Sequence, residues 1–65
     1  MEILTWQARA SHNITLKQLE KMSGISKTSL NDIENGKICP TLFQLESIAK
    51  ALDMKITDLF ESDYK

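Results

Sequence analysis

Apolar residues recur at helical spacing along most of the chain, in short runs separated by Asn, Gly and Pro. This pattern predicts an all-α fold, a compact bundle of five short helices. The first helix is expected from about Glu2 to Ser11, with Thr5 on the same side as its apolar positions. Asn13 is expected to end it, because Asn tolerates the left-handed backbone conformation found after helices.

The second predicted helix begins after Thr15, a good N-cap residue, and Gln18 three residues later completes a capping box. Leu16 and Leu19 lie along its inward face. Gly24 is expected to end the helix, because a residue without a Cβ can turn back at low steric cost.

The third predicted helix covers about residues 27–35 and has Ser26 as its N-cap. Leu30 and Ile33, three residues apart, are its inward positions. Its outward positions are polar, namely Lys27, Thr28, Asn31 and Asp32. Asn35-Gly36 is expected to end the helix; a hairpin turn at this pair is disfavoured because its flanks do not alternate apolar and polar residues.

The fourth predicted helix follows Pro40, with Thr41 as its N-cap. Its apolar stripe has i, i+3, i+4 spacing and consists of Leu42, Leu45, Ile48, Ala49 and Leu52. A last helix of about two turns is expected to carry Ile56, Leu59 and Phe60. Residues 62–65 are expected to fray. No internal repeat or linker is evident, so residues 1–65 are expected to form one domain.

Composition narrows the possible functions. The 65 residues are 42% hydrophobic and 26% charged, which is ordinary for one small globular domain. Such a chain leaves no room for a substrate cleft beside its core, and it offers no nucleophile–base pair, phosphate loop or metal-ligand set, so no enzyme and no cofactor are expected. Cys39 is the only cysteine, which fits a reducing cytoplasmic setting. No membrane span and no secretion leader are evident.

The charge is unevenly distributed, although the formal net charge is only −1. Residues 9–37 hold five basic and three acidic side chains, whereas residues 38–65 hold three basic and five acidic ones. The positive charge therefore lies in the part of the chain that contains the second and third helices, where a nucleic acid would be bound.

Residues 15–37 have the layout of a helix-turn-helix unit. A helix of about eight residues is followed by a tight turn at Gly24 and by another short helix. In such units the first helix rests on the DNA backbone and the second enters the major groove. The polar outward side chains of the third helix can bond to base edges or phosphates.

The sequence resembles the lambda repressor/Cro-type helix-turn-helix domain, the XRE family, over about residues 3–60. The resemblance rests on segments at the family's spacing: Thr15-Leu16-Lys17-Gln18-Leu19, Gly24-Ile25-Ser26, Ile33-Glu34-Asn35-Gly36-Lys37, Pro40-Thr41, Ile48-Ala49-Lys50-Ala51-Leu52 and Leu59-Phe60. It implies a five-helix bundle that binds a double-stranded DNA operator as a homodimer and represses transcription. It implies no small-molecule substrate.

The resemblance also assigns roles to individual residues. The expected base contacts are Lys27, Thr28, Asn31 and Asp32. The expected contacts with the DNA backbone that the resemblance implies are Thr15, Leu16, Asn35 and Lys37. Lys17, a basic side chain, and Ser29, on the polar outer face of the third helix, are added from the residues themselves. Arg9 and Glu34 match a pair of positions that form a structural ion pair between the first and third helices. The alternative for Arg9, Glu34, Lys17 and Lys27 is that they are ordinary solvated surface charges. For Thr28 it is a helix-start residue that bonds to its own backbone.

Two residues depart from the family pattern. Relatives often have Gln where this chain has Leu16, so a phosphate contact there is expected from the backbone N–H. Relatives favour Ala where this chain has Glu20, at the close approach of the second and third helices. We therefore expect the Glu20 carboxylate to bend out to solvent.

Several other side chains suggest roles outside DNA reading. Trp6 is expected to pack against the last helix, His12 to cap or cover the end of the first, and Cys39 to pack in the loop before the fourth. Met54, Phe60 and Tyr64 are expected to form a dimer interface or, alternatively, to close the core of the monomer.

The leading hypothesis is a sequence-specific DNA-binding transcription regulator, a homodimeric repressor. The alternative is a protein-interaction module with the same fold, such as an antitoxin or anti-repressor. The net charge of −1 and the acidic Asp32 on the outward face of the third helix motivate that alternative.

Overall fold

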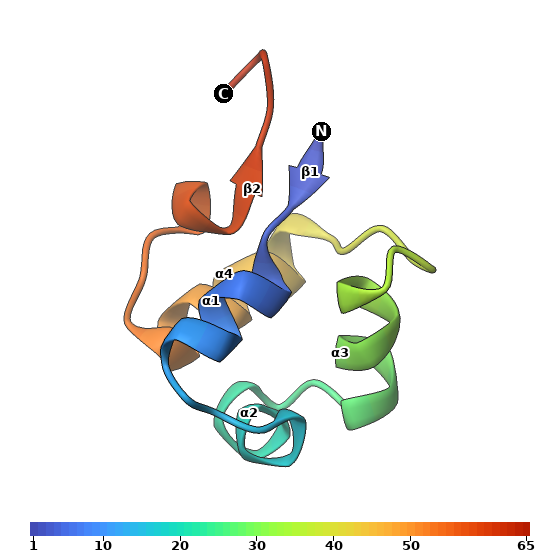
Figure 1. Cartoon of the computed structure of the whole chain (residues 1–65), viewed down its shortest axis with the longest axis vertical. Coiled ribbons are helices and arrows are strands. Elements are labelled where there is room, and N and C mark those ends of the chain that lie inside the picture. The colour runs from blue at the N-terminus through green and yellow to red at the C-terminus, as the bar shows by residue number, and fades with distance from the viewer.

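The computed structural model describes residues 1–65 and is mostly helical, as predicted, but it has four α-helices rather than five (Figure 1). The helices are α1 (Thr5–Ser11), α2 (Leu16–Ser23), α3 (Lys27–Glu34) and α4 (Leu42–Leu52). A single 3₁₀ turn, η1 (Ile56–Leu59), follows α4, and two short strands, β1 (Glu2–Ile3) and β2 (Phe60–Glu61), complete the fold. None of the helices has the length and apolar character that crossing a membrane requires.

The two ends of the chain pair as a small antiparallel sheet that the sequence pattern did not predict (Figure 1). Glu2 lies opposite Glu61 and Ile3 opposite Phe60. The first helix therefore begins at Thr5 rather than near Glu2, and the predicted fifth helix shrinks to the η1 turn before β2. Strands of two residues are too short to show an alternating pattern, and their pairing joins the two ends of the chain, so no local signal contains it.

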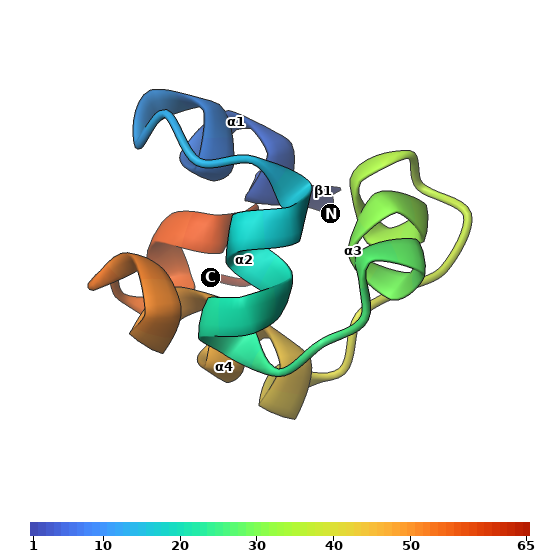
Figure 2. The same ribbon diagram turned by 90° about the horizontal axis from the view of Figure 1, so that it is seen from below.

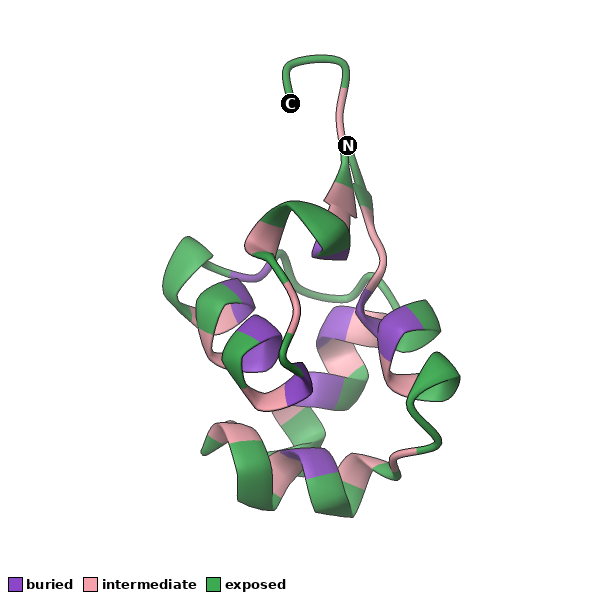
Figure 3. Ribbon diagram, turned by 90° about the vertical axis from the view of Figure 1, so that its left-hand side faces the viewer, coloured by how far each residue is buried: buried purple, intermediate pink, exposed green.

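The helices pack around α4. Seen from below, α2 crosses in front of α4 with α3 at its side (Figure 2), and α2 packs against both. Nine buried apolar side chains form the core: Ala8, Leu19, Leu30, Ile33, Leu45, Ile48, Ala49, Leu52 and Leu59. The buried positions lie on the inner sides of the helices (Figure 3).

One member of the predicted α4 stripe is not in the core. Leu42 is 73% exposed and Phe43 beside it is 74% exposed, whereas Leu45 and Ile48 are buried. The stripe therefore does not predict which of its members are buried, because spacing specifies a direction around a helix and not the depth of burial.

The predicted N-caps of α2, α3 and α4 are confirmed. Thr15 and Gln18 form a complete capping box: the Thr15 Oγ1 accepts from the Gln18 N–H at 3.1 Å, and the Gln18 Oε1 accepts from the Thr15 N–H at 2.8 Å. Ser26 caps α3 by accepting from the Ser29 N–H. Thr41 caps α4 and also forms a box with its N3 residue.

The two capping boxes lie in two copies of one hexapeptide. The sequence TLKQLE occupies residues 15–20 and TLFQLE occupies residues 41–46, with one difference between them. The expectation of no internal repeat was therefore wrong at this short length. The same helix-start signal is used twice because two helices need the same backbone groups satisfied.

The predicted ends of α1, α2 and α3 are also confirmed. Asn13 after α1 has a φ of 55° and Gly24 after α2 has a φ of 77°. At the end of α3, Gly36 has a φ of 75°, its N–H donates to the Ile33 carbonyl, and the N–H of the next residue, Lys37, donates to the Asp32 carbonyl at 2.9 Å. This is a Schellman motif, which satisfies the last carbonyls of α3 and sets the direction of the following loop.

Candidate nucleic-acid interface

The turn between α2 and α3 is short and its backbone is bonded at both sides. The Gly24 N–H donates to the Glu20 carbonyl at 2.9 Å, and Ser26 caps α3. Between them, Ile25 is partly buried and packs against the core. These contacts hold α2 and α3 in the arrangement seen in Figure 2, a helix-turn-helix.

The third helix presents two chemically different faces. Leu30 and Ile33 are both 1% exposed and anchor the helix to the rest of the domain. Lys27, Thr28 and Asn31 are exposed, and their spacing of three and four residues gives them one shared face. This face combines an ammonium group, a hydroxyl and an amide on a helix whose opposite side is fixed in the core.

Two of the predicted DNA contacts on α3 are less accessible. Asp32 is partly buried, and its backbone carbonyl accepts in the Schellman motif. Ser29 is also partly buried; its N–H donates to the Ser26 Oγ and its own Oγ accepts from the Ser26 hydroxyl at 3.0 Å. Ser29 is therefore engaged in the cap of α3.

The start of α2 offers backbone donors rather than a polar side chain at its first position. Leu16 is partly buried and packs against the core, which accounts for an aliphatic residue there. The capping box uses the N–H groups of Thr15 and Gln18. The first turn of an α-helix has N–H groups without intrahelical acceptors, so those of Leu16 and Lys17 remain available for an anion.

The loop after α3 carries the other two predicted backbone contacts. Asn35 and Lys37 are both exposed. The Schellman motif at Gly36 fixes the main chain between them, so Lys37 extends from an ordered turn.

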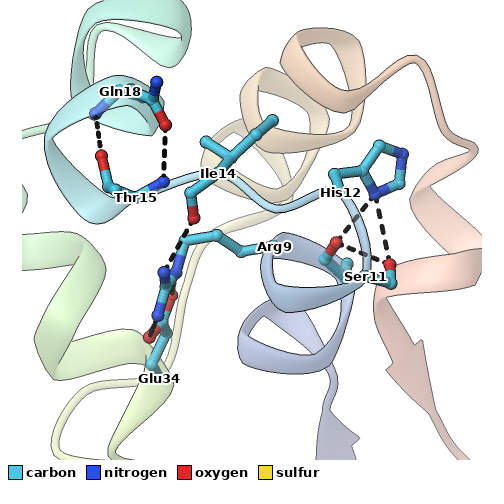
Figure 4. Close-up of polar contacts among 8 residues, drawn as sticks. Arg9, Ser11, His12, Ile14, Thr15, Gln18 and Glu34 are labelled. Carbon is cyan, nitrogen blue, oxygen red and sulfur yellow. Dashed lines mark hydrogen bonds and ion pairs between the residues drawn. The ribbon is translucent and has the colours of Figure 1, made fainter.

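Arg9 joins three segments of the chain (Figure 4). Its Nε donates to Glu34 Oε2 at 2.7 Å and its Nη2 to Glu34 Oε1 at 3.0 Å, while its Nη1 donates to the Ile14 carbonyl at 2.9 Å. The Glu34 side chain is only 5% exposed and that of Arg9 17%. The hydrogen bonds with Glu34, supported by its negative charge, raise the pKa of Arg9 against the opposing effect of burial. The C-terminal end of α3 is thereby tied to α1.

Glu20 makes a contact that sequence reasoning missed. Its Oε2 accepts from the N–H of Lys27, the first residue of α3, at 2.8 Å. The bond lies at an exposed position, as expected for this carboxylate, but the expectation did not include a contact with α3. The available signal was a carboxylate a short distance before the start of a helix, where exposed N–H groups attract negative charge.

Other side chains occupy structural positions. The His12 Nδ1 lies 2.8 Å from the Ala8 carbonyl, so His12 covers the end of α1 as predicted. Cys39 is exposed, which contradicts its predicted packing role. Trp6 is about half exposed. Met54 and Phe60 are partly buried against the core, whereas Tyr64 is exposed.

The C-terminal residues 62–65 form a turn. The Lys65 Nζ donates to the Phe60 carbonyl at 3.1 Å and lies 5.6 Å from the centre of the Phe60 ring. No group of three or more His, Cys, Asp or Glu side chains is arranged to hold a metal ion.

Comparison with known proteins agrees with this geometry. The family model described as helix-turn-helix matches residues 7–59. An uncharacterized HTH-type transcriptional regulator of Methanocaldococcus jannaschii is 42% identical over 52 residues, which cover 80% of this chain and 79% of that protein. No solved structure matches the chain significantly. With the family match extending from α1 to η1, this chain belongs to the lambda repressor/Cro-type (XRE) helix-turn-helix family.

Proposed function

We propose that this protein is a sequence-specific DNA-binding transcription regulator that inserts α3 into the major groove. The observation that carries the proposal is the exposed polar face of α3, formed by Lys27, Thr28 and Asn31 on a helix anchored through Leu30 and Ile33. Membership of the helix-turn-helix family and similarity to an HTH-type transcriptional regulator support it.

In this proposal the side chains of α3 read base edges. The Asn31 amide suits adenine, to which it can donate and accept at once, and the Thr28 hydroxyl can bond to several bases or contact a thymine methyl group. Lys27 can reach guanine or a phosphate. Asp32 repels phosphate and can accept from the amino group of cytosine, so it would penalise other sequences.

Contacts with the DNA backbone would fix the register of the protein. The N–H groups at the start of α2, together with the side chains of Thr15 and Lys17, would approach one phosphate stretch. Asn35 and Lys37 would approach another from the loop after α3. Ser29 is kept among the proposed contacts with the DNA backbone because part of its surface is exposed.

The proposals for the oligomeric state and the sign of regulation rest on the family resemblance alone. We propose a homodimer that represses transcription by occupying a two-fold symmetric operator. Its two α3 helices would read half-sites about one helical turn, roughly 34 Å, apart.

Selection of bound sites from a random DNA pool, followed by fluorescence anisotropy on the selected duplex, tests the proposal. Saturable binding that prefers the selected site and weakens steeply with salt is expected, and a palindromic site would indicate the dimer. Equal binding to selected and scrambled duplexes would overturn sequence-specific regulation.

A protein-interaction module is the second candidate. Leu42 and Phe43, adjacent at the start of α4, are both exposed, and the net charge of the chain is −1. This candidate requires a stoichiometric complex with a protein partner together with no sequence-preferring DNA binding, so the same anisotropy measurement separates the two.

A further inference from the structure

Glu20 bridges the turn of the helix-turn-helix with two separate groups. Its backbone carbonyl accepts from the N–H of Gly24, where α2 ends, at 2.9 Å. Its side-chain Oε2 accepts from the N–H of Lys27, where α3 begins, at 2.8 Å. One residue of α2 therefore contacts both sides of the turn.

The contact with Lys27 complements the cap of α3. Ser26 accepts from the Ser29 N–H, and Glu20 accepts from the Lys27 N–H. Two of the first three N–H groups of α3 are thereby bonded, and a carboxylate at a helix N-terminus interacts favourably with the helix dipole. Ser26 caps α3 from its own segment, whereas Glu20 connects α3 to another helix.

Glu46 provides an internal comparison. It is the last residue of the second hexapeptide, TLFQLE, as Glu20 is of the first. Glu46 is exposed, and none of the side-chain hydrogen bonds or salt bridges of the chain involves it. The contact of Glu20 therefore results from the approach of α2 to α3 and not from the hexapeptide.

We propose that Glu20 is a positioning residue that holds the N-terminal end of α3, and with it Lys27 and Thr28, at the angle to α2 that base reading requires. This inference rests on the proposed DNA-binding function. With Arg9 holding Glu34 at the other end, α3 is attached to neighbouring segments at both termini.

The test compares Glu20→Ala and Glu20→Gln with the matched controls Glu46→Ala and Glu46→Gln. Affinities for the selected duplex and for a random-sequence duplex are measured by anisotropy. Glu20→Ala is expected to lower the ratio of the two affinities about tenfold, since it removes a hydrogen bond to a charged group. Glu20→Gln retains an acceptor oxygen and is expected to keep the ratio, because a lost charge acts on the phosphates of every sequence alike.

A second readout reports the contact without DNA. Amide hydrogen exchange at Lys27 is expected to accelerate about tenfold in Glu20→Ala and to stay near the wild-type rate in Glu20→Gln and in both Glu46 variants. Should Glu20→Ala unfold, Glu20→Met keeps the length of the side chain without its acceptor and is measured instead.

The outcomes separate the two proposals. An equal change in the Glu20→Ala and Glu46→Ala ratios, or no change in either, overturns the positioning role while DNA binding stands. If the wild type has no preference for the selected duplex, the proposed function fails and the base-reading role of Glu20 fails with it. The rate of amide hydrogen exchange at Lys27 then still shows whether Glu20 holds the N-terminal end of α3.

Discussion

Arg9 on α1 and Glu34, the last residue of α3, are joined by two side-chain hydrogen bonds of 2.7 and 3.0 Å. A two-bond arginine–carboxylate pair is stronger and more directional than a single-bond pair. Because Arg9 also donates to the Ile14 carbonyl, the pair connects α1, the loop before α2 and the end of α3. It therefore fixes the C-terminal end of the helix proposed to read DNA.

The ion pair should contribute measurably to stability. We expect Arg9→Ala and Glu34→Ala each to lower the free energy of unfolding by about 2 kcal/mol, since either change leaves a largely buried charge without its partner. In urea unfolding, a double-mutant cycle should give a coupling energy of about 1–3 kcal/mol. A coupling near zero would show that the pair behaves like an exposed one.

Changes on the outward face of α3 should affect DNA binding and not folding. Thr28→Ala and Asn31→Ala are each expected to lower affinity for the selected duplex about tenfold or more. Their melting temperatures should stay close to that of the wild type, because both side chains are exposed. Anisotropy and thermal unfolding measure the two effects; loss of folding in either variant would show that the residue has a structural role instead.

Lys37 should contribute through charge alone. Lys37→Ala is expected to weaken binding to every duplex by a similar factor and to make the slope of log affinity against log salt shallower by about one. Lys50, also exposed but on α4, supplies the control, and Lys50→Ala should leave that slope unchanged. A sequence-dependent loss in Lys37→Ala would instead indicate base contact.

Thr5 carries a polar group that the core does not use. The residue is 1% exposed, and its Oγ1 has no hydrogen-bond partner. Valine has nearly the same shape without the hydroxyl, so Thr5→Val is expected to raise the free energy of unfolding by about 1 kcal/mol. Thr57→Val, at an exposed position, should change it little. Destabilisation by Thr5→Val would mean that the hydroxyl is bonded in solution.

Much of the fold could be predicted from short-range signals. The caps at Thr15, Ser26 and Thr41 and the stop at Gly24 depend on bonds within a few residues, and all four lie where they were expected. The two faces of α3 follow from the helical period in the same way.

Other features could not be predicted because they depend on which segments meet. The pairing of β1 with β2 joins the two ends of the chain and shortens the first and last predicted helices. Leu42 and Cys39 are exposed, and exposure depends on which distant segments cover a residue and not on its spacing or its type.

The candidate site also has features that the sequence predicts and features that only packing determines. Composition, spacing and family resemblance predicted the helix-turn-helix at residues 15–37 and the polar side chains of α3. They could do so because local hydrogen bonds and the helical period depend only on residues that are close in the sequence. The bond from Glu20 to the Lys27 N–H required the close approach of α2 and α3, which packing around the core creates. A hydrogen bond tolerates a variation of only about half an ångström in the distance between donor and acceptor. Distances between helices reach that precision only when the whole chain packs.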